Sequence, residues 1–415
     1  MTGRIHLKSG EKRGAVWSAV GNTMYALTSV IFLIVINRTG EISTTGSFSL
    51  AYTVAQLLLY IGIFGVSALQ ITDYAERYSF ADYFWFRMVT TAGMLLFGVA
   101  AGLVLGAEND KFLYTVLLTA FMAVNSFADL YQCRFLQLTR LDLNGKALFF
   151  RMLLSSAAFT LILLLTKSVT SGLLGMLFVN AAATAFWCVR VNHALTTREY
   201  GFSRSRFALL LRDSLPLCVG LFLINFIIGC PKYGIDYFLS DAEQGYYNLI
   251  FMPAAVINLF SQFVFLPLLN RFSAALNSPD TSVFRELFIK SLLFLLALTL
   301  IAAFGAYLLG PAVFGFFYGT DLSAYRMEMF VVMLGGGLFA LYQLYYYVFV
   351  ILKKQKTILR NLSICALAAV PLACGLIPWK GILGACLTYM VSLLLLAAEF
   401  AVSFKRNRRE TPARG

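Results

Sequence analysis

One lysine lies inside a segment that is otherwise largely apolar. Lys232 follows Pro231 in the sequence PKYGIDYFL, and Asp236 comes four residues later, on the same face of a helix. An ionisable group within a membrane costs roughly 2.5–3.5 kcal/mol on insertion scales, so it usually faces a cavity or a partner. Two interpretations stay open: an intrahelical Lys232–Asp236 pair at the outer interface, or a cavity cation for an anionic ligand. A lone interfacial pair would not need the proline, which frees a backbone carbonyl.

Further polar side chains lie in or beside the apolar segments. Arg38, at the outer end of the first segment, is the corresponding cation in the first half of the chain, and an ordinary interfacial arginine is the alternative. Amides suit ligand contact or helix–helix hydrogen bonding. With Lys232, Asp236 and Arg38, the candidate substrate-binding residues are Asn22, Asn37, Gln56, Gln70, Asn225, Asn258 and Gln262. Asp129 is expected to pair with the nearby Arg134.

The sequence offers little for covalent chemistry. Its two histidines, His6 and His193, lie outside the apolar segments. The pair Gly145-Lys146 lacks the preceding glycine-rich loop and the following Ser or Thr of a P-loop, so direct use of ATP is not expected. We therefore expect a protein that is not an enzyme and that carries no metal or other cofactor.

Apolar runs of membrane-spanning length fill the chain. Hydrophobic residues make up 60% of the 415 and charged residues only 13%, and the mean hydropathy is +0.77. A run of about 20 apolar residues crosses a hydrocarbon core of about 30 Å as a helix, whereas barrel strands are half as long. The pattern predicts an all-α polytopic membrane protein of about twelve spans, near 15–36, 47–69, 84–106, 112–133, 147–166, 170–190, 213–239, 247–270, 287–309, 327–351, 359–377 and 381–404.

Basic residues concentrate in alternate gaps between these segments. The two tails and every second gap hold 27 of the 33, and the other gaps and segments hold Arg38, Lys111, Lys167, Lys232, Arg326 and Lys380. The positive-inside rule places both termini and the gap 191–212 in the cytoplasm, which requires an even number of spans. This topology and anionic lipid headgroups account for the net charge of +13, so no nucleic-acid partner is expected.

The two halves of the chain share local sequence features. Asn37 matches Asp236, Gly46 matches Gly245 and Phe48 matches Tyr247 at a constant offset. Both halves begin and end inside, which indicates a parallel repeat of six helices. We expect two pseudo-symmetric lobes, 1–205 and 206–415, a layout typical of transporters that expose a central cavity alternately to each side.

The stretch PKYGIDYFLSDAEQGYYNLIF resembles spans 7–8 of Wzx-like polysaccharide flippases, with an aspartate at the end of span 7, a short turn and then Gly-x-Tyr. Pro267 lies near the end of span 8, as in that family. The segment NRTGEISTTGSFSLAY is similar to their turn between spans 1 and 2, although Glu41 replaces the usual proline. The chain is thus similar over its whole length to the multidrug/oligosaccharidyl-lipid/polysaccharide (MOP) flippase superfamily.

This resemblance implies a V-shaped pair of lobes around a cationic cavity in a bacterial inner membrane. The implied substrate is an undecaprenyl-diphosphate-linked oligosaccharide that moves from the cytoplasmic to the outer leaflet for surface polysaccharide assembly. Implied partners are membrane lipids, a polysaccharide polymerase and glycosyltransferases. A diphosphate carries about two negative charges, which cations and amides would bind.

Three alternatives remain open. A lipid II-type flippase shares the same headgroup chemistry. A multidrug antiporter of the MATE type is expected to have carboxylates deep within its spans. A membrane glycosyltransferase or polymerase is expected to have a long outer loop with catalytic residues, and no outer gap exceeds about 20 residues.

The topology is directly testable. Single cysteines introduced into the gap 191–212 should not react with an impermeant thiol reagent in intact cells, because that gap is expected to face the cytoplasm. The parent without the introduced cysteine controls for the seven native ones. Labelling of the gap before lysis would contradict the orientation.

Overall fold

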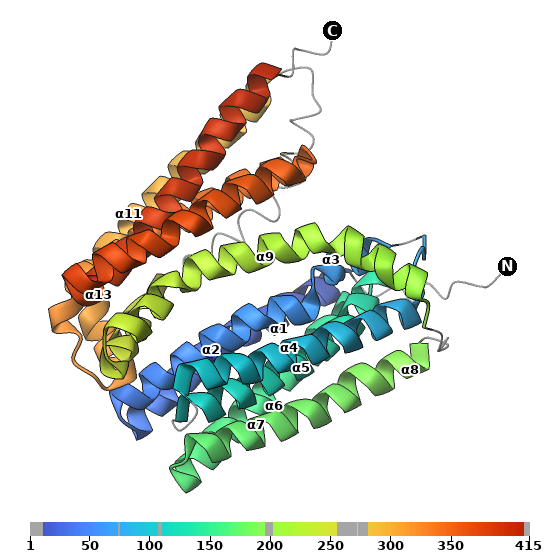
Figure 1. Cartoon of the computed structure of the whole chain (residues 1–415), viewed down its shortest axis with the longest axis horizontal. Helices are drawn as coiled ribbons and strands as arrows, with labels where there is room; N and C mark the ends of the chain where they lie inside the picture. The colour runs from blue at the N-terminus through green and yellow to red at the C-terminus, as the bar shows by residue number, and fades with distance from the viewer. Residues whose placement is uncertain are drawn as a thin grey trace. The chain divides into compact units, whose positions relative to one another are not determined.

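The computed structural model describes residues 11–73, 75–106, 110–195, 202–254, 272 and 281–410. In these ranges the regular structure is helical, without strands (Figure 1). Ten helices are long and apolar enough to cross a membrane. The helices are α1 (Glu11–Thr39), α2 (Ile42–Ile63), α3 (Val66–Thr72), α4 (Phe80–Gly106), α5 (Asp110–Gln137), α6 (Leu141–Thr166), α7 (Val169–Thr184), η1 (Ala185–Arg190), α8 (Val191–Leu195), α9 (Arg204–Phe238), α11 (Thr281–Tyr318), η2 (Ser323–Tyr325), α12 (Arg326–Ile351) and α13 (Gln355–Glu410).

Two further features bring the spans to the predicted twelve. The candidate span within α13 has 52 residues, about 78 Å as a straight helix, which is far more than one bilayer crossing needs. Its backbone leaves the helical conformation at Gly381, where φ is 58° and ψ is −132°. Helical residues 241–254 begin the span expected at 247–270. The all-helical polytopic fold expected from the sequence is therefore confirmed.

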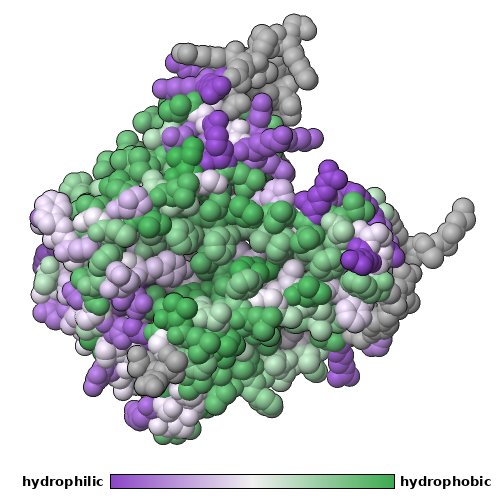
Figure 2. All heavy atoms as spheres, viewed as in Figure 1, coloured by the Kyte–Doolittle hydropathy of each residue, from purple (hydrophilic) through white to green (hydrophobic). Residues whose placement is uncertain are grey.

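The surface of the molecule is that of a protein immersed in lipid. Figure 2 shows hydrophobic residues over much of the visible face. Leu96, Phe178 and Leu308 are among many large apolar side chains that are exposed. In water such extended apolar surface would drive association, whereas a bilayer solvates it.

The chain divides into two compact units, Met1–Phe222 and Leu223–Gly415, and the division falls inside α9. The lobe boundary expected from the sequence, between residues 205 and 206, lies near the beginning of the same helix. That boundary and the pseudo-symmetry of the lobes stay predictions.

In the first unit, α5 is the central helix and contacts α2, α3, α4, α6 and α7. The crossing of α1 and α6 depends on two glycines. A Cβ on Gly21 would lie 2.6 Å from the Gly145 carbonyl oxygen, and a Cβ on Gly145 would lie 2.2 Å from the Trp17 carbonyl carbon. Small residues allow such close backbone approach between membrane helices. Gly145, which resembled part of a P-loop only superficially, is thus a packing residue.

The span predicted at 47–69 is interrupted. α2 ends at Ile63, Phe64 and Gly65 have positive φ, and the short helix α3 begins at Val66. A helix end leaves backbone carbonyls without partners. Here the Gly62 carbonyl accepts hydrogen bonds from Arg87 Nη1 at 3.2 Å and Thr90 Oγ1 at 2.8 Å, both from α4.

Arg87 also neutralises a carboxylate of α5. Its Nη2 lies 2.9 Å from Asp129 Oδ2, and Ser67 of α3 donates a hydrogen bond to the same oxygen. Arg87 is 1% exposed. The expectation that Asp129 pairs with Arg134 is therefore wrong: Arg134 bonds Glu76 and Gln137 instead. The partner of Asp129 comes from another helix, α4, which packs on α5.

In the second unit, three consecutive glycines allow α12 to pack on three neighbours. A Cβ on Gly335 would lie 2.5 Å from the Tyr389 ring of α13, and one on Gly337 would lie 2.2 Å from Thr299 of α11. Gly336 faces Ala254, with 3.3 Å between the added Cβ and the Ala254 Cβ. α12 therefore makes close contact with α11, with α13 and with helical residues 241–254.

Arg87 should be more important for stability than an exposed arginine with an ion pair of its own. Arg87→Ala removes the cation that pairs with Asp129 and one of the two donors to the Gly62 carbonyl, and we expect a loss of about 1–3 kcal/mol in unfolding free energy. Arg77 is the matched control: it pairs with Asp213 at 3.4 Å, with side chains 62% and 32% exposed, and Arg77→Ala should cost about 0–1 kcal/mol.

Heat-induced loss of the monodisperse peak in detergent measures both variants. Adding Asp129→Asn to Arg87→Ala should restore part of the loss, since it removes the uncompensated charge. Equal melting temperatures for Arg87→Ala and Arg77→Ala would contradict this role for the buried pair.

Candidate functional site

Lys232 lies in the part of α9 that belongs to the second unit. Pro231, directly before it, is inside the helix and buried, and it deprives the Ile227 carbonyl of its regular donor. Lys232 is partly buried, and its Nζ lies 5.2 Å from the centroid of the Phe251 ring. The face of an aromatic ring attracts a cation electrostatically.

Aromatic rings form one wall beside this lysine. The Phe251 ring packs edge-on against Tyr389 at 5.0 Å between centroids and is stacked with Tyr247 at 5.9 Å. On α9, Phe226 and Tyr233 are stacked at 6.0 Å. Rings of this kind hold sugars and cations while keeping the surroundings apolar.

Helical residues 241–254 carry a row of amides on the face that includes Phe251. Gln244, Asn248 and Phe251 are spaced four and three residues apart, which places them on one side of a helix. Both Gln244 side-chain polar atoms and Asn248 Oδ1 are buried and bond no residue that the structure describes, while Asn248 Nδ2 donates to the Gln244 carbonyl. Neither residue was predicted, because Gln244 precedes the span expected at 247–270 and Asn248 lies at its beginning; their spacing of four residues was the one signal.

The other predicted residues of the second unit surround this group only in part. Asp236 lies one turn beyond Lys232 on α9 and is partly buried, and so is Asn225 earlier in the helix. Asn258 and Gln262 lie outside the described residues. The structure thus brings Lys232 and Asp236 onto one helix face next to aromatic and amide groups that were not predicted.

The candidates of the first unit are more scattered. Arg38 and Asn22 are exposed on α1, and Asn37 Oδ1 accepts a hydrogen bond from Thr45 at 3.4 Å. Gln56 is partly buried on α2. Gln70 is fully buried, and its Nε2 donates to the Leu130 carbonyl at 3.1 Å. That bond joins α3 to α5, which is the helix–helix role that was the alternative for each amide.

A second buried cation was missed by sequence reasoning. Arg151 of α6 is 1% exposed, and its Nη2 donates to Asn125 Oδ1 at 2.5 Å. The same oxygen accepts from Asn180 Nδ2 at 3.0 Å. Among the described residues, Arg151 has amide partners but no carboxylate within ion-pair distance. In the sequence, Arg151 lies near the beginning of an expected span, beside a gap rich in basic residues. It was therefore counted among the arginines that mark the cytoplasmic side.

The second-unit group has the chemistry of a receptor for an anionic, hydroxyl-bearing headgroup. It combines one ammonium, amides with unused hydrogen-bonding capacity and several aromatic rings. Charge-assisted bonds to phosphate oxygens are stronger than neutral ones, and amides and rings suit sugars. The group contains no pair of carboxylates or other nucleophile–base arrangement that would suggest catalysis among the described residues.

Comparison with known proteins identifies the family of this chain and other proteins with its fold. The profile of the family described as "Polysaccharide biosynthesis protein" matches residues 12–273. No curated protein matches the chain. Solved structures show the same fold at low sequence identity.

One of them is the lipid II flippase MurJ in an inward closed conformation, with a TM-score of 0.71, 13% identity and coverage of 93% of this chain and 87% of MurJ. Another is a mutant of the MATE transporter VcmN from Vibrio cholerae, with a TM-score of 0.65, 14% identity and coverage of 97% and 98%. A MOP superfamily transporter from Pyrococcus furiosus has a TM-score of 0.60, 13% identity and coverage of 98% of both chains. A multi-pass membrane protein with this profile match over residues 12–273 belongs to the polysaccharide biosynthesis protein family.

Proposed function

We propose that this protein is a Wzx-like flippase that moves an undecaprenyl-diphosphate-linked oligosaccharide from the cytoplasmic to the outer leaflet of a bacterial inner membrane. The observation that carries the proposal is the group around Lys232, which offers a cation, unpaired amides and aromatic rings inside a membrane-spanning unit. Both termini would be cytoplasmic, and a polymerase and glycosyltransferases would act after and before it in surface polysaccharide assembly.

Transport of lipid II is the second candidate, supported by the likeness to MurJ. Its headgroup joins a sugar to the same polyprenyl diphosphate, so the Lys232 group fits it equally well. Comparing the two substrates in the same vesicles separates these functions.

Exchange of protons or sodium, as in an antiporter, finds less support. A coupling carboxylate must be able to change its charge state within the membrane. Asp129 is paired with Arg87, and Asp82 is paired with Arg206 at 2.9 Å. Both carboxylates are thus engaged by arginines of the protein.

Lys232→Ala should abolish export of the lipid-linked sugar, because it removes the cation that contacts the diphosphate. Lys232→Arg should retain part of the activity, since the charge remains while its geometry changes. Lys380→Ala is the matched control: Lys380 also lies over an aromatic ring, Trp379 at 4.4 Å, but it is exposed near the kink of α13.

Surface polysaccharide and membrane-inserted protein are measured together in cells that lack the native gene. Loss of export in Lys232→Ala at a normal protein level supports the role. Full export by this variant would assign Lys232 to the interfacial alternative.

Membrane potential should drive the outward step. About two negative charges crossing a potential of 100 mV, inside negative, gain up to about 4–5 kcal/mol, a bias of more than a thousandfold. In proteoliposomes, a potassium–valinomycin potential should accelerate flipping of a polyprenyl-diphosphate sugar without any pH gradient. A response only to a proton or sodium gradient would contradict potential-driven transport and favour ion exchange.

A further inference from the structure

The two buried arginines of the first unit differ in their partners. Arg87 and Arg151 are each 1% exposed. Arg87 forms an ion pair with Asp129, at 2.9 Å between Nη2 and Oδ2. Arg151, on α6, has no carboxylate within ion-pair distance among the residues that the structure describes. A buried arginine keeps its proton, so Arg151 is a permanent positive charge inside a membrane-spanning unit.

The nearest acidic helix position does not supply the missing charge. Asp129 lies one turn along α5 from Asn125, which is the hydrogen-bond partner of Arg151. Its Oδ2 is already taken by Arg87 and by the hydroxyl of Ser67. The Arg87–Asp129 pair is neutral as a whole, and the interior around Arg151 therefore keeps one uncompensated positive charge.

The groups around Arg151 come from α5 and from α7 with the helical turn that follows it. Arg151 Nη2 donates to Asn125 Oδ1 at 2.5 Å, and the same oxygen accepts from Asn180 Nδ2 at 3.0 Å. Asn180, Thr184 and Cys188 are spaced four residues apart and are all buried, so they form one row on a helix face. The Cys188 thiol lies beside the guanidinium, which places this row next to Arg151.

This cluster contains hydrogen-bonding atoms that the protein does not use. Arg151 Nε, Thr184 Oγ1 and Asn180 Oδ1 are buried and bond none of the described residues. The Nε–H and the threonine hydroxyl are donors, and the guanidinium carries a full charge. Thr184 also directly precedes the π-helical turn η1 (Ala185–Arg190), and such turns are frequent at functional sites. Unused donors beside an uncompensated cation are suited to an anion.

We infer that Arg151 is the centre of a binding site for a small monovalent anion, such as chloride, inside the first unit. One negative charge balances the one excess positive charge, and Arg151 Nε and Thr184 Oγ1 are the donors that receive it. Asn125, Asn180 and Thr184 are at most 8% exposed. A headgroup joined to a sugar and a lipid chain must extend out of its site, whereas a free ion can be enclosed. The site is therefore separate from the Lys232 group and does not depend on the proposed function.

The test measures the melting temperature of the full-length protein in detergent. Sodium chloride or sodium bromide replaces sodium gluconate at constant ionic strength. A ligand that binds only the folded state raises the melting temperature with its concentration, and we expect a saturable rise of about 2–4 °C. Arg77→Gln is the control for exposed arginines, since Arg77 is 62% exposed, and it should leave this rise unchanged.

Asn125→Asp supplies the missing negative charge without a change of shape. The new carboxylate can still accept the bonds from Arg151 Nη2 and Asn180 Nδ2. We expect this variant to melt at a higher temperature than the parent in gluconate and to show no further rise in chloride. Arg151→Gln removes the positive charge and should abolish the rise as well.

A rise that is present in the parent and in Arg77→Gln but absent from Asn125→Asp supports the anion site. Equal melting temperatures of the parent in gluconate and chloride would overturn it. An undiminished rise in Asn125→Asp would overturn it too, and this result decides the matter even if Arg151→Gln does not fold. A larger rise with inorganic pyrophosphate or undecaprenyl phosphate than with chloride would overturn the assignment to a small anion and assign Arg151 to the lipid-linked headgroup.

Discussion

A bilayer interior supplies no water to a polar group, so a polar group buried in either unit needs a hydrogen-bond partner from the protein or from a ligand. In the first unit, Arg87 neutralises Asp129 and caps the end of α2, Gln70 joins α3 to α5, and Arg151 is held by the Asn125–Asn180 pair. Buried hydrogen-bonding atoms that bond no described residue remain in both units, among them Arg151 Nε in the first unit and those of Gln244 and Asn248 in the second. A ligand that supplied those partners would recover the cost of burying them.

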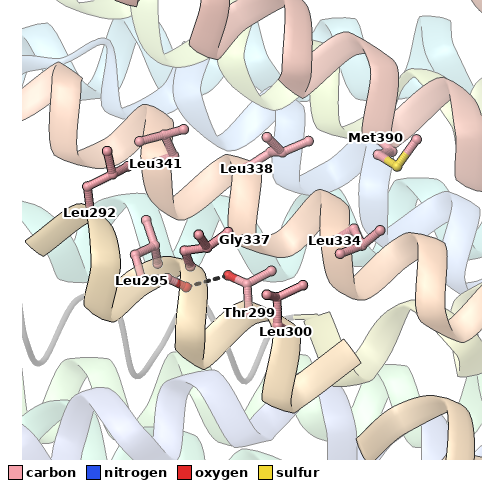
Figure 3. A pocket seen from close by; sticks show the side chains of 10 residues that line it. Leu292, Leu295, Thr299, Leu300, Leu334, Gly337, Leu338, Leu341 and Met390 are labelled. Atoms are coloured by element: carbon pink, nitrogen blue, oxygen red, sulfur yellow. Dashed lines mark hydrogen bonds between the residues drawn. The ribbon is translucent and has the colours of Figure 1, made fainter. Parts of the chain in front are cut away.

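Glycines bring helices into close contact in both units. Gly21 and Gly145 bring α1 and α6 into backbone contact, and the triplet 335–337 does the same for α12 on three sides. Without an apolar driving force between helices in lipid, this close contact is a main source of association. Because glycine has no side chain, the triplet also leaves space beside α12 that side chains would otherwise fill. A groove of about 270 Å³ next to Gly337, lined almost entirely by apolar side chains of α11, α12 and α13, is one such space (Figure 3).

The sequence predicted the spans well, because length and hydropathy alone determine them. It could not predict the break at Phe64–Gly65, where an apolar run of spanning length hides two positive-φ residues. It placed Asp129 with Arg134, five residues away, when the true partner is Arg87 on another helix. Lys232 was found because a charge in an apolar segment is conspicuous, whereas Gln244 and Asn248 lie before and at the beginning of the expected span 247–270, where polar residues are ordinary. Arg151 was classed by its place near a gap, and only three-dimensional packing reveals that it is fully buried.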